Sequence, residues 1–178
     1  MARLPYADPN RAEVAPITAR IVQERGSVLH LYAMLLHSAP VAEGWLRFLT
    51  AIRHECALPG SVRELVIMQV AHLNHAPYEA EQHAPIALRE GLTPAQVGAL
   101  PNWQHSDEFG ERERAVLAYC DMMTRTVHVD GAVFEAVRRH FDERMMVELT
   151  ATIAAYNMVS RFIEAVGISS SDNMDPVR

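Results

Sequence analysis

Side chains suited to proton transfer are concentrated between residues 64 and 83. This segment contains Glu64, His72, His75, Glu79 and His83. A carboxylate tuned by burial and an imidazole that titrates near neutrality form a serviceable acid–base pair. Glu79 and His83 are four residues apart, so a helix would place them on one face. We interpret Glu64, Glu79 and His83 as candidate catalytic residues, with His83 as the main proton carrier.

The same segment leaves a metal site open as an alternative. Four of its residues are separated from one another by three, four and four positions: His72, His75, Glu79 and His83. On one continuous helix they would share a face and offer a ligand set that suits zinc, iron or manganese. Pro77 is expected to break that helix between the two pairs. We therefore expect no stoichiometric metal and assign no metal ligand.

The residues around this break are candidates for the wall of a substrate pocket. They are His72, Asn74, His75 and Tyr78. Each has a structural alternative, since a histidine can be structural and a tyrosine is most often a core residue. The catalytic candidates have alternatives too. Glu64 completes a Ser61-x-x-Glu64 capping-box pattern, and Glu79 with His83 could form an exposed helical pair.

The spacing resembles the core motif of the carboxymuconolactone decarboxylase and alkylhydroperoxidase D (AhpD) family. In the peroxidase branch, the motif runs glutamate, eleven residues, cysteine, two residues, cysteine, three residues, histidine. Glu64 and His83 occupy the outer positions here, whereas Ala76 and Glu79 replace the two cysteines. The resemblance implies that Glu64 and His83 belong to a proton relay. It also places the chain in a branch without the redox pair.

Further segments resemble the same family and extend the likeness over residues 28–168. They are Leu-His-Ser-Ala-Pro-Val-Ala-Glu-Gly-Trp (36–45), Arg-Glu-Leu-Val-Ile (63–67), Gln-His-Ala-Pro-Ile-Ala (82–87), Arg-Ala-Val-Leu-Ala-Tyr (114–119) and Tyr-Asn-Met-Val-Ser-Arg-Phe (156–162). The resemblance implies an AhpD-like multi-helical bundle. It also implies a homotrimer or hexamer, with active sites near subunit boundaries.

The amino-acid composition excludes several classes of partner and cofactor. The net charge is −6, and all sixteen cationic side chains are arginine. Without a basic run, nucleic acid is not an expected partner. Without lysine, no Schiff base can form. No phosphate loop or glycine fingerprint for a nucleotide is present. We expect a small-molecule substrate and no cofactor.

The two cysteines, Cys56 and Cys120, lie in apolar helical patterns far from the motif. The simplest interpretation is a pair of buried free thiols in a reducing compartment. A disulfide or a reactive thiol is the alternative. Thiol peroxidase activity is disfavoured, because no cysteine near the motif remains to attack peroxide.

Hydrophobic periodicity and turn residues predict an all-α protein of about eight or nine helices. Thr93 is expected to cap a short helix that begins at Pro94. The last helix is apolar nearly all round, so it should lie in a core or against another subunit. The expected helices cover about 10–25, 28–37, 41–56, 61–74, 77–90, 94–100, 111–126, 131–141 and 142–167.

At 178 residues, the chain fits a single domain. We expect an N-terminal helical arm over 1–27, the AhpD-like domain over 28–168 and a flexible tail over 169–178. No apolar stretch approaches the ~20 residues of a membrane span, and no signal core is seen, so a cytoplasmic protein is expected. The apolar content of 49% favours a homo-oligomer with an interface formed by helices near 111–126 and 147–167.

Three functions follow from these patterns. The first is a decarboxylase-like enzyme that uses acid–base chemistry on a small carboxylated or lactone-like molecule. The second is an AhpD-like hydroperoxidase, which would have to use Cys56 or Cys120. The third is a non-catalytic binding or assembly protein that keeps only the fold.

Overall fold

The computed structural model describes residues 1–174 and is helical throughout that range, without a strand. The chain forms two compact units. One consists of residues 1–55 together with the C-terminal stretch from Ile163, and the other runs from Cys56 to Phe162. The all-α prediction is confirmed. The predicted boundaries after residues 27 and 168 stay predictions, and residues 175–178 of the predicted tail lie outside the described part.

The first unit contains three α-helices: α1 (Ala15–Arg25), α2 (His30–Leu35) and α3 (Ala39–Thr50). A π-helical turn, η1 (Ala51–Glu55), continues α3. Apolar side chains of all three helices form its core, among them Ile21, Tyr32 and Leu46. At the C-terminal end of this unit, Asp172 accepts hydrogen bonds from Tyr6 Oη (2.7 Å) and from the backbone amides of Ala2 and Ser169.

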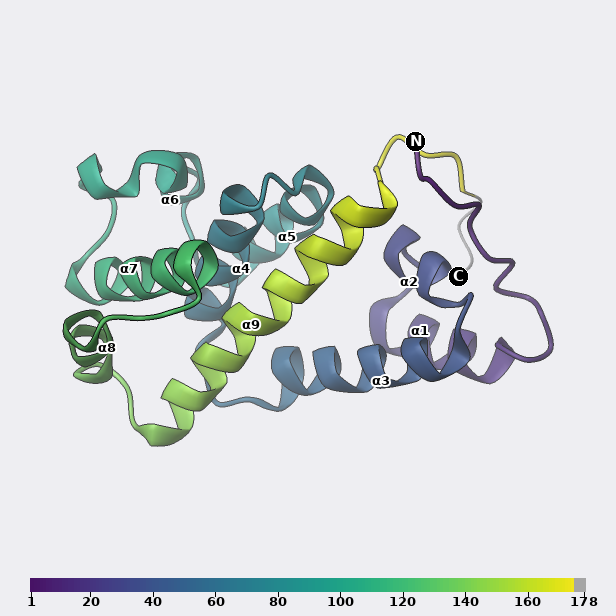
Figure 1. Ribbon diagram of the computed structural model, residues 1–178, viewed down its shortest axis with the longest axis horizontal. Coiled ribbons are helices and arrows are strands. Elements are labelled where there is room, and N and C mark those ends of the chain that lie inside the picture. The colour runs from purple at the N-terminus through teal and green to yellow at the C-terminus, as the bar shows by residue number, and fades with distance from the viewer. Residues whose placement is uncertain (175–178) are drawn as a thin grey trace. The chain divides into compact units, whose positions relative to one another are not determined.

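The second unit holds the remaining helices and all the candidate site residues (Figure 1). Helix α9 extends beyond it into residues 163–166. The helices are α4 (Gly60–Leu73), α5 (Pro77–Arg89), α6 (Pro94–Ala99), the 3-10 helix η2 (Leu100–His105), α7 (Glu111–Thr126), α8 (Gly131–Arg138) and α9 (Glu143–Val166). Helix α4 lies centrally, packed against α5, α7 and η2, and its residues 64–71 are all buried.

Helices α4 and α5 form a hairpin whose tight turn follows from local sequence. Helix α4 ends at Leu73, and His75 takes the left-handed conformation with φ of 53°. The amide of Ala76 then bonds to the carbonyl of Ala71 at 2.8 Å, which closes the helix end in the manner of a Schellman motif. Pro77 opens α5, where a proline costs no hydrogen bond. The predicted break before Pro77 is confirmed.

Of the two predicted helix caps, the one at Thr93 is present and the one at Ser61 is not. Thr93 caps α6 in a reciprocal capping box with Gln96, as the Thr-Pro sequence indicated. The capping box at Ser61 is wrong. Helix α4 begins at Gly60 after Pro59, and no side chain caps it. The carboxylate of Glu64 is instead buried among charged partners, and a charge-assisted contact is stronger than a cap to a neutral amide.

Candidate functional site

The hairpin brings Glu64 and His83 into direct contact. Their positions differ by 19 residues, yet His83 Nδ1 lies 2.8 Å from Glu64 Oε2. Glu64 is fully buried and His83 is 8% exposed. Arg63 donates from Nε to the other carboxylate oxygen at 3.1 Å and also pairs with Glu90 at 3.0 Å. The carboxylate therefore has a hydrogen-bond donor on each oxygen.

These partners determine the ionisation of Glu64. Burial alone would raise its pKa, but the hydrogen bond and charge of His83, together with Arg63, outweigh burial and lower the pKa. An ionised carboxylate can only accept, so His83 Nδ1 must carry the proton in this contact. In the neutral ring, Nε2 then carries the lone pair that can accept a proton. The contact with Glu64 thus holds the neutral His83 ring in the tautomer with its proton on Nδ1.

Helix α9 covers the other side of this pair. The ring of Tyr156 meets the His83 imidazole edge to face, with centroids 5.0 Å apart and an interplanar angle of 90°. Glu79 is also buried, at 2% exposure. It accepts a hydrogen bond of 2.6 Å from Ser160 Oγ. Glu79 lies one helical turn from His83 on α5, and its contact with Ser160 links α5 to α9.

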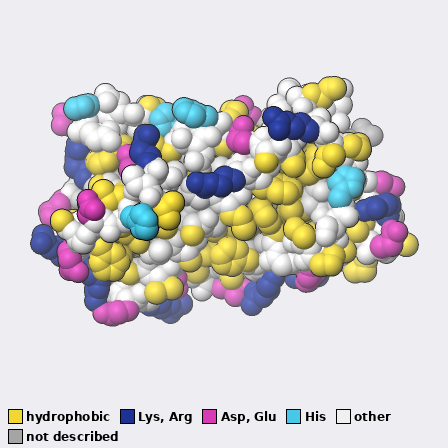
Figure 2. All heavy atoms as spheres, in the orientation of Figure 1, with side chains coloured by type: hydrophobic (Ala, Val, Ile, Leu, Met, Phe, Trp, Pro, Cys, Tyr) yellow, Lys and Arg dark blue, Asp and Glu magenta, His cyan; other side chains and the backbone are white. Residues whose placement is uncertain are grey.

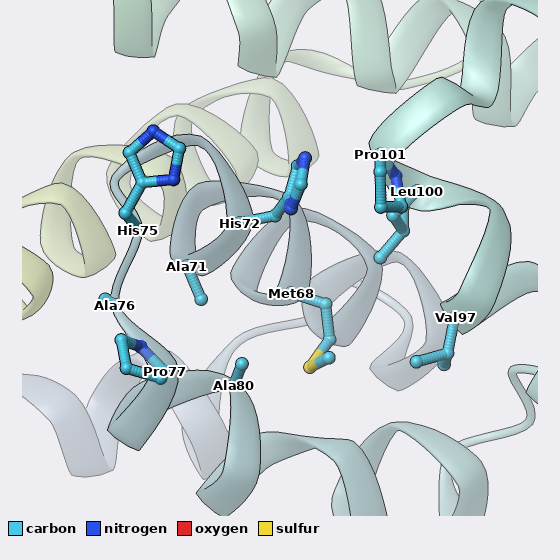
Figure 3. Close-up of a pocket in the computed structure, with 10 residues that line it drawn as sticks. All are labelled: Met68, Ala71, His72, His75, Ala76, Pro77, Ala80, Val97, Leu100 and Pro101. Atoms are coloured by element: carbon cyan, nitrogen blue, oxygen red, sulfur yellow. The ribbon is translucent and has the colours of Figure 1, made fainter. Parts of the chain in front are cut away.

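A pocket of about 450 Å³ opens beside this hairpin (Figure 3). Its walls come from the C-terminal half of α4, the turn, the first residues of α5, and α6 with η2. Figure 3 shows the two imidazoles at one edge, above alanine and methionine side chains. The lining residues are Met68, Ala71, His72, His75, Ala76, Pro77, Ala80, Val97, Leu100 and Pro101.

The pocket lies one turn from the Glu64–His83 pair along both helices. Met68 follows Glu64 by four residues on α4, and Ala80 precedes His83 by three residues on α5. Residues at these spacings share a helix face. Ala76, which stands at the first cysteine position of the peroxidase motif, is one of the lining residues. The hairpin thus carries the pocket and, one turn away along each helix, the buried Glu64–His83 pair.

Of the four predicted pocket residues, the structure places His72 and His75 on the pocket and the other two outside its lining. The side chain of Asn74 donates to Asn157 Oδ1 at 3.1 Å, which links the end of α4 to α9. Tyr78 is buried, with 3% of its surface exposed. Of the predicted catalytic residues, Glu64 and His83 meet directly.

Sequence reasoning missed the residues by which α9 and α7 support the site. Tyr156 and Ser160 lie in the 156–162 segment that carried part of the family likeness, so a signal for them existed. Asp121 is the other omission. Its carboxylate accepts from Gln69 Nε2 at 2.6 Å and from Trp103 Nε1 at 3.3 Å. These contacts tie η2, which forms one pocket wall, to α4 and α7.

The structure separates the four residues of the metal alternative. His75 lies exposed at the turn, whereas Glu79 and His83 are buried against other partners. Within residues 1–174, no group of three or more histidine, cysteine, aspartate or glutamate side chains is arranged to hold a metal ion.

Cys56 and Cys120 are not joined in a disulfide, and neither belongs to the pocket lining or to the buried pair. Cys120 is completely buried, and burial is the main cause that raises the pKa of its thiol. Its sulfur lies 3.8 Å from the carbonyl oxygen of Val66. Cys56 is half-buried. No helix of the described part is both long and apolar enough to cross a bilayer.

Solved structures with the same architecture include two that cover most of the chain. A peroxidase-related protein from Silicibacter sp. TM1040 superposes with a TM-score of 0.81 at 20% identity, over 94% of this chain and 91% of that one. A variant of the debrominase Bmp8 in complex with 2,3,4-tribromopyrrole gives a TM-score of 0.78 at 21% identity, over 94% and 89%. At such identities the likeness establishes the AhpD-like fold alone.

Sequence comparison gives the family. YdfG of Bacillus subtilis is 27% identical over 109 residues, which are 60% of this chain and 74% of that protein. YnjA of Escherichia coli is 30% identical over 127 residues, 70% of this chain and 66% of that protein. The pattern of the carboxymuconolactone decarboxylase family matches residues 39–122, which include the whole α4–α5 hairpin. The AhpD-like fold agrees with this match, and the chain belongs to the carboxymuconolactone decarboxylase family.

Proposed function

We propose that this protein is an acid–base enzyme acting on a small carboxylated or lactone-like molecule, with its own side chains carrying the proton. The observation that supports this most directly is the buried contact between His83 Nδ1 and the Glu64 carboxylate. A base oriented by a carboxylate is the arrangement that general acid–base catalysis requires. The pocket beside it offers a place for the molecule on which the base acts.

The chemistry would proceed through His83 Nε2. As a base, this nitrogen would remove a proton from a carbon next to a carbonyl group. In a decarboxylation, the bond to the carboxylate carbon breaks, carbon dioxide leaves, and the electron pair moves into the conjugated carbonyl. For this reaction His83 would have to start in its protonated form; it delivers that proton to carbon, and the ring then takes up a new proton from water. Glu64 stabilises the imidazolium formed in either direction, because the carboxylate is already ionised.

Glu79 would act through a separate contact. Its carboxylate accepts from Ser160 and lies one turn from His83, so its charge can act on the imidazole. The alternative hydroperoxidase is not supported by the geometry. The two cysteine positions of the motif hold Ala76 and Glu79, and Cys120 is buried with a raised pKa.

Solvent deuterium exchange into a panel of small lactones and unsaturated carboxylic acids, followed by NMR, tests the proposal. Wild type should promote exchange or decarboxylation of at least one panel member. His83→Asn and Glu64→Gln should each reduce that rate by about a hundredfold or more. His128→Gln is the matched control, since His128 is exposed and outside the pocket. Full activity in His83→Asn would refute the assignment.

We also propose that the chain assembles into a homotrimer or hexamer. A groove between α8 and α9 is lined largely by apolar side chains, with Phe134, Met146 and Val147 among them. Val147 is 68% exposed and Phe134 is 38% exposed. Figure 2 shows hydrophobic side chains gathered over the face on which α9 runs. Exposed apolar patches of this kind usually mark interfaces.

Light scattering tests the assembly. We expect a mass of three or six times 19.9 kDa, and Val147→Glu should lower it, because a charge would be buried without a partner. Val41→Glu is the matched control, since Val41 is an exposed valine on α3 and outside the predicted interface. A mass of a single chain in wild type would contradict the proposal, and a dimer would refute its stoichiometry.

A further inference from the structure

The pocket beside the hairpin has an unusual distribution of polarity. Eight of its lining residues are apolar: Met68, Ala71, Ala76, Pro77, Ala80, Val97, Leu100 and Pro101. The other two are His72 and His75, and they lie at the same edge (Figure 3). A ligand that matches this lining is largely apolar and carries its polar group at one end.

The lining residues bear no permanent charge. No arginine lines the pocket, although the chain has sixteen, and no aspartate or glutamate lines it either. A carboxylate or phosphate would therefore lose water without gaining a fixed positive charge, and an amine would find no counter-charge. Burying an unpaired charge costs far more than a small pocket of apolar contacts returns. The lining thus favours a neutral ligand over a charged one.

The two imidazoles complement one functional group in particular. A neutral imidazole has one nitrogen that donates and one that accepts. A hydroxyl group also donates once and accepts, so it can be satisfied by either ring or bridged between both. An ether or an ester can only accept, and a hydrocarbon can do neither. His72 is half-buried and His75 is exposed, so both rings can reach a group at the pocket edge.

The apolar part of the pocket suits a ring. Three alanines, at 71, 76 and 80, leave the inner surface without side-chain atoms beyond Cβ, and prolines 77 and 101 add rigid walls. The volume of about 450 Å³ lies in the range of small-molecule sites. A flat six-membered ring could lie along the alanines with its substituent directed to the imidazole edge.

We propose that this pocket binds a neutral ring compound that carries a hydroxyl group, a phenol or a cyclic enol. The ring lies against the alanines and the hydroxyl lies at the edge formed by His72 and His75. This inference rests on the proposed function, since it names the substrate class of the same site. Within the proposed class, the lining disfavours the carboxylated molecules, because it offers no fixed positive charge, and it favours neutral rings that bear a hydroxyl group.

Three probes of similar size test the class by isothermal titration calorimetry on the full chain. Phenol can donate and accept, anisole can only accept, and benzoate is charged. We expect phenol to bind about tenfold more tightly than either of the others. Anisole lacks the hydrogen bond that the hydroxyl donates, and the charge of benzoate has no partner in the lining. Equal binding of phenol and anisole, or tighter binding of benzoate, would overturn the proposal.

Pocket variants locate the binding. His72→Leu combined with His75→Gly should weaken phenol about tenfold and bring it to the level of anisole. Glycine is chosen because position 75 has a positive φ. Ala80→Leu should weaken both probes by filling the pocket. The matched controls are His128→Ala and Ala95→Leu, which lie outside the lining and should leave both affinities unchanged. Unchanged phenol binding in Ala80→Leu would refute the site.

One further variant separates this inference from the proposed function. Glu64→Gln should leave phenol affinity within twofold, because Glu64 is buried beyond the lining, while it removes proton transfer. If phenol binds as expected but no panel member is turned over, the pocket assignment stands and the acid–base function fails. If His83-dependent turnover is found only with carboxylates and phenol does not bind, the function stands and this inference fails.

Discussion

The two ends of the α4–α5 hairpin carry the same residue types in different environments. At the turn, His72 and His75 line an open pocket and bear no ion pair with a carboxylate in the described structure. Away from the turn, His83 is buried against an ionised Glu64 that Arg63 also contacts. In our proposal, His72 and His75 recognise a ligand, whereas Glu64 and His83 hold and move a proton. The difference arises from partners and burial, since spacing alone placed all these residues in one set.

The same comparison explains why helix spacing overstated a metal site. Imidazoles at intervals of three and four share a face only while the helix continues. The left-handed residue at position 75 and the proline at position 77 end α4 and start α5 in a new direction. The turn therefore divides the motif into two groups of side chains, one at the turn and one further along α5, although their spacing in the sequence is regular.

The largest expected effect concerns turnover. His83→Asn should lower kcat by about 10²- to 10⁴-fold with little change in KM, because it removes the proton carrier and leaves the pocket intact. His72→Leu should mainly raise KM. Steady-state kinetics on a substrate identified by deuterium exchange would measure both. If the two variants changed kcat equally, the division of the hairpin into a binding end and a proton-transfer end would be wrong.

The next effect is on stability. Glu64→Gln should reduce the free energy of unfolding by roughly 2 kcal/mol, since it removes the buried negative charge and replaces one of the two acceptor oxygens with an NH₂ group that faces a donor. His75→Gly should change it by less than about 0.5 kcal/mol, because the side chain is exposed and glycine fits the backbone. Urea unfolding monitored by circular dichroism gives both values. Comparable losses in the two variants would contradict the contrast in burial.

A pH dependence sharpens the comparison further. Because the pKa of Glu64 is lowered in the folded protein, its ionised form adds stability above the unfolded pKa of about 4.5. That stability is lost as the pH falls through the folded pKa. The stability difference between wild type and Glu64→Gln should therefore be largest near neutral pH and shrink below about pH 4.5. A difference that grew on acidification would have the wrong sign.

The smallest effect is expected at the cysteines. Replacing Cys56 with serine and Cys120 with alanine should leave any peroxide consumption unchanged, because Cys120 is buried with a raised pKa and neither thiol adjoins the Glu64–His83 pair. A peroxide assay with dithiothreitol as reductant would measure this. Loss of a thiol-dependent activity in the double variant would restore the hydroperoxidase alternative.

The sequence by itself determined the helices and the break between α4 and α5. Proline at 77, the Thr-Pro start of α6 and the apolar periodicity act within a few residues, so local patterns suffice. The motif also identified Glu64 and His83, through the family resemblance and the likeness of their spacing. The replacement of both motif cysteines, at positions 76 and 79, was equally visible.

Only the tertiary structure decided which partner each polar side chain takes. Glu64 matched a capping pattern yet lies buried against His83, and Glu79 bonds to Ser160, which is 81 residues away. Asn74, at the end of α4, bonds to Asn157 on α9. These contacts depend on how α4, α5 and α9 pack. A polar group that becomes buried must find whatever partner that packing brings within reach, and local spacing carries no information about it.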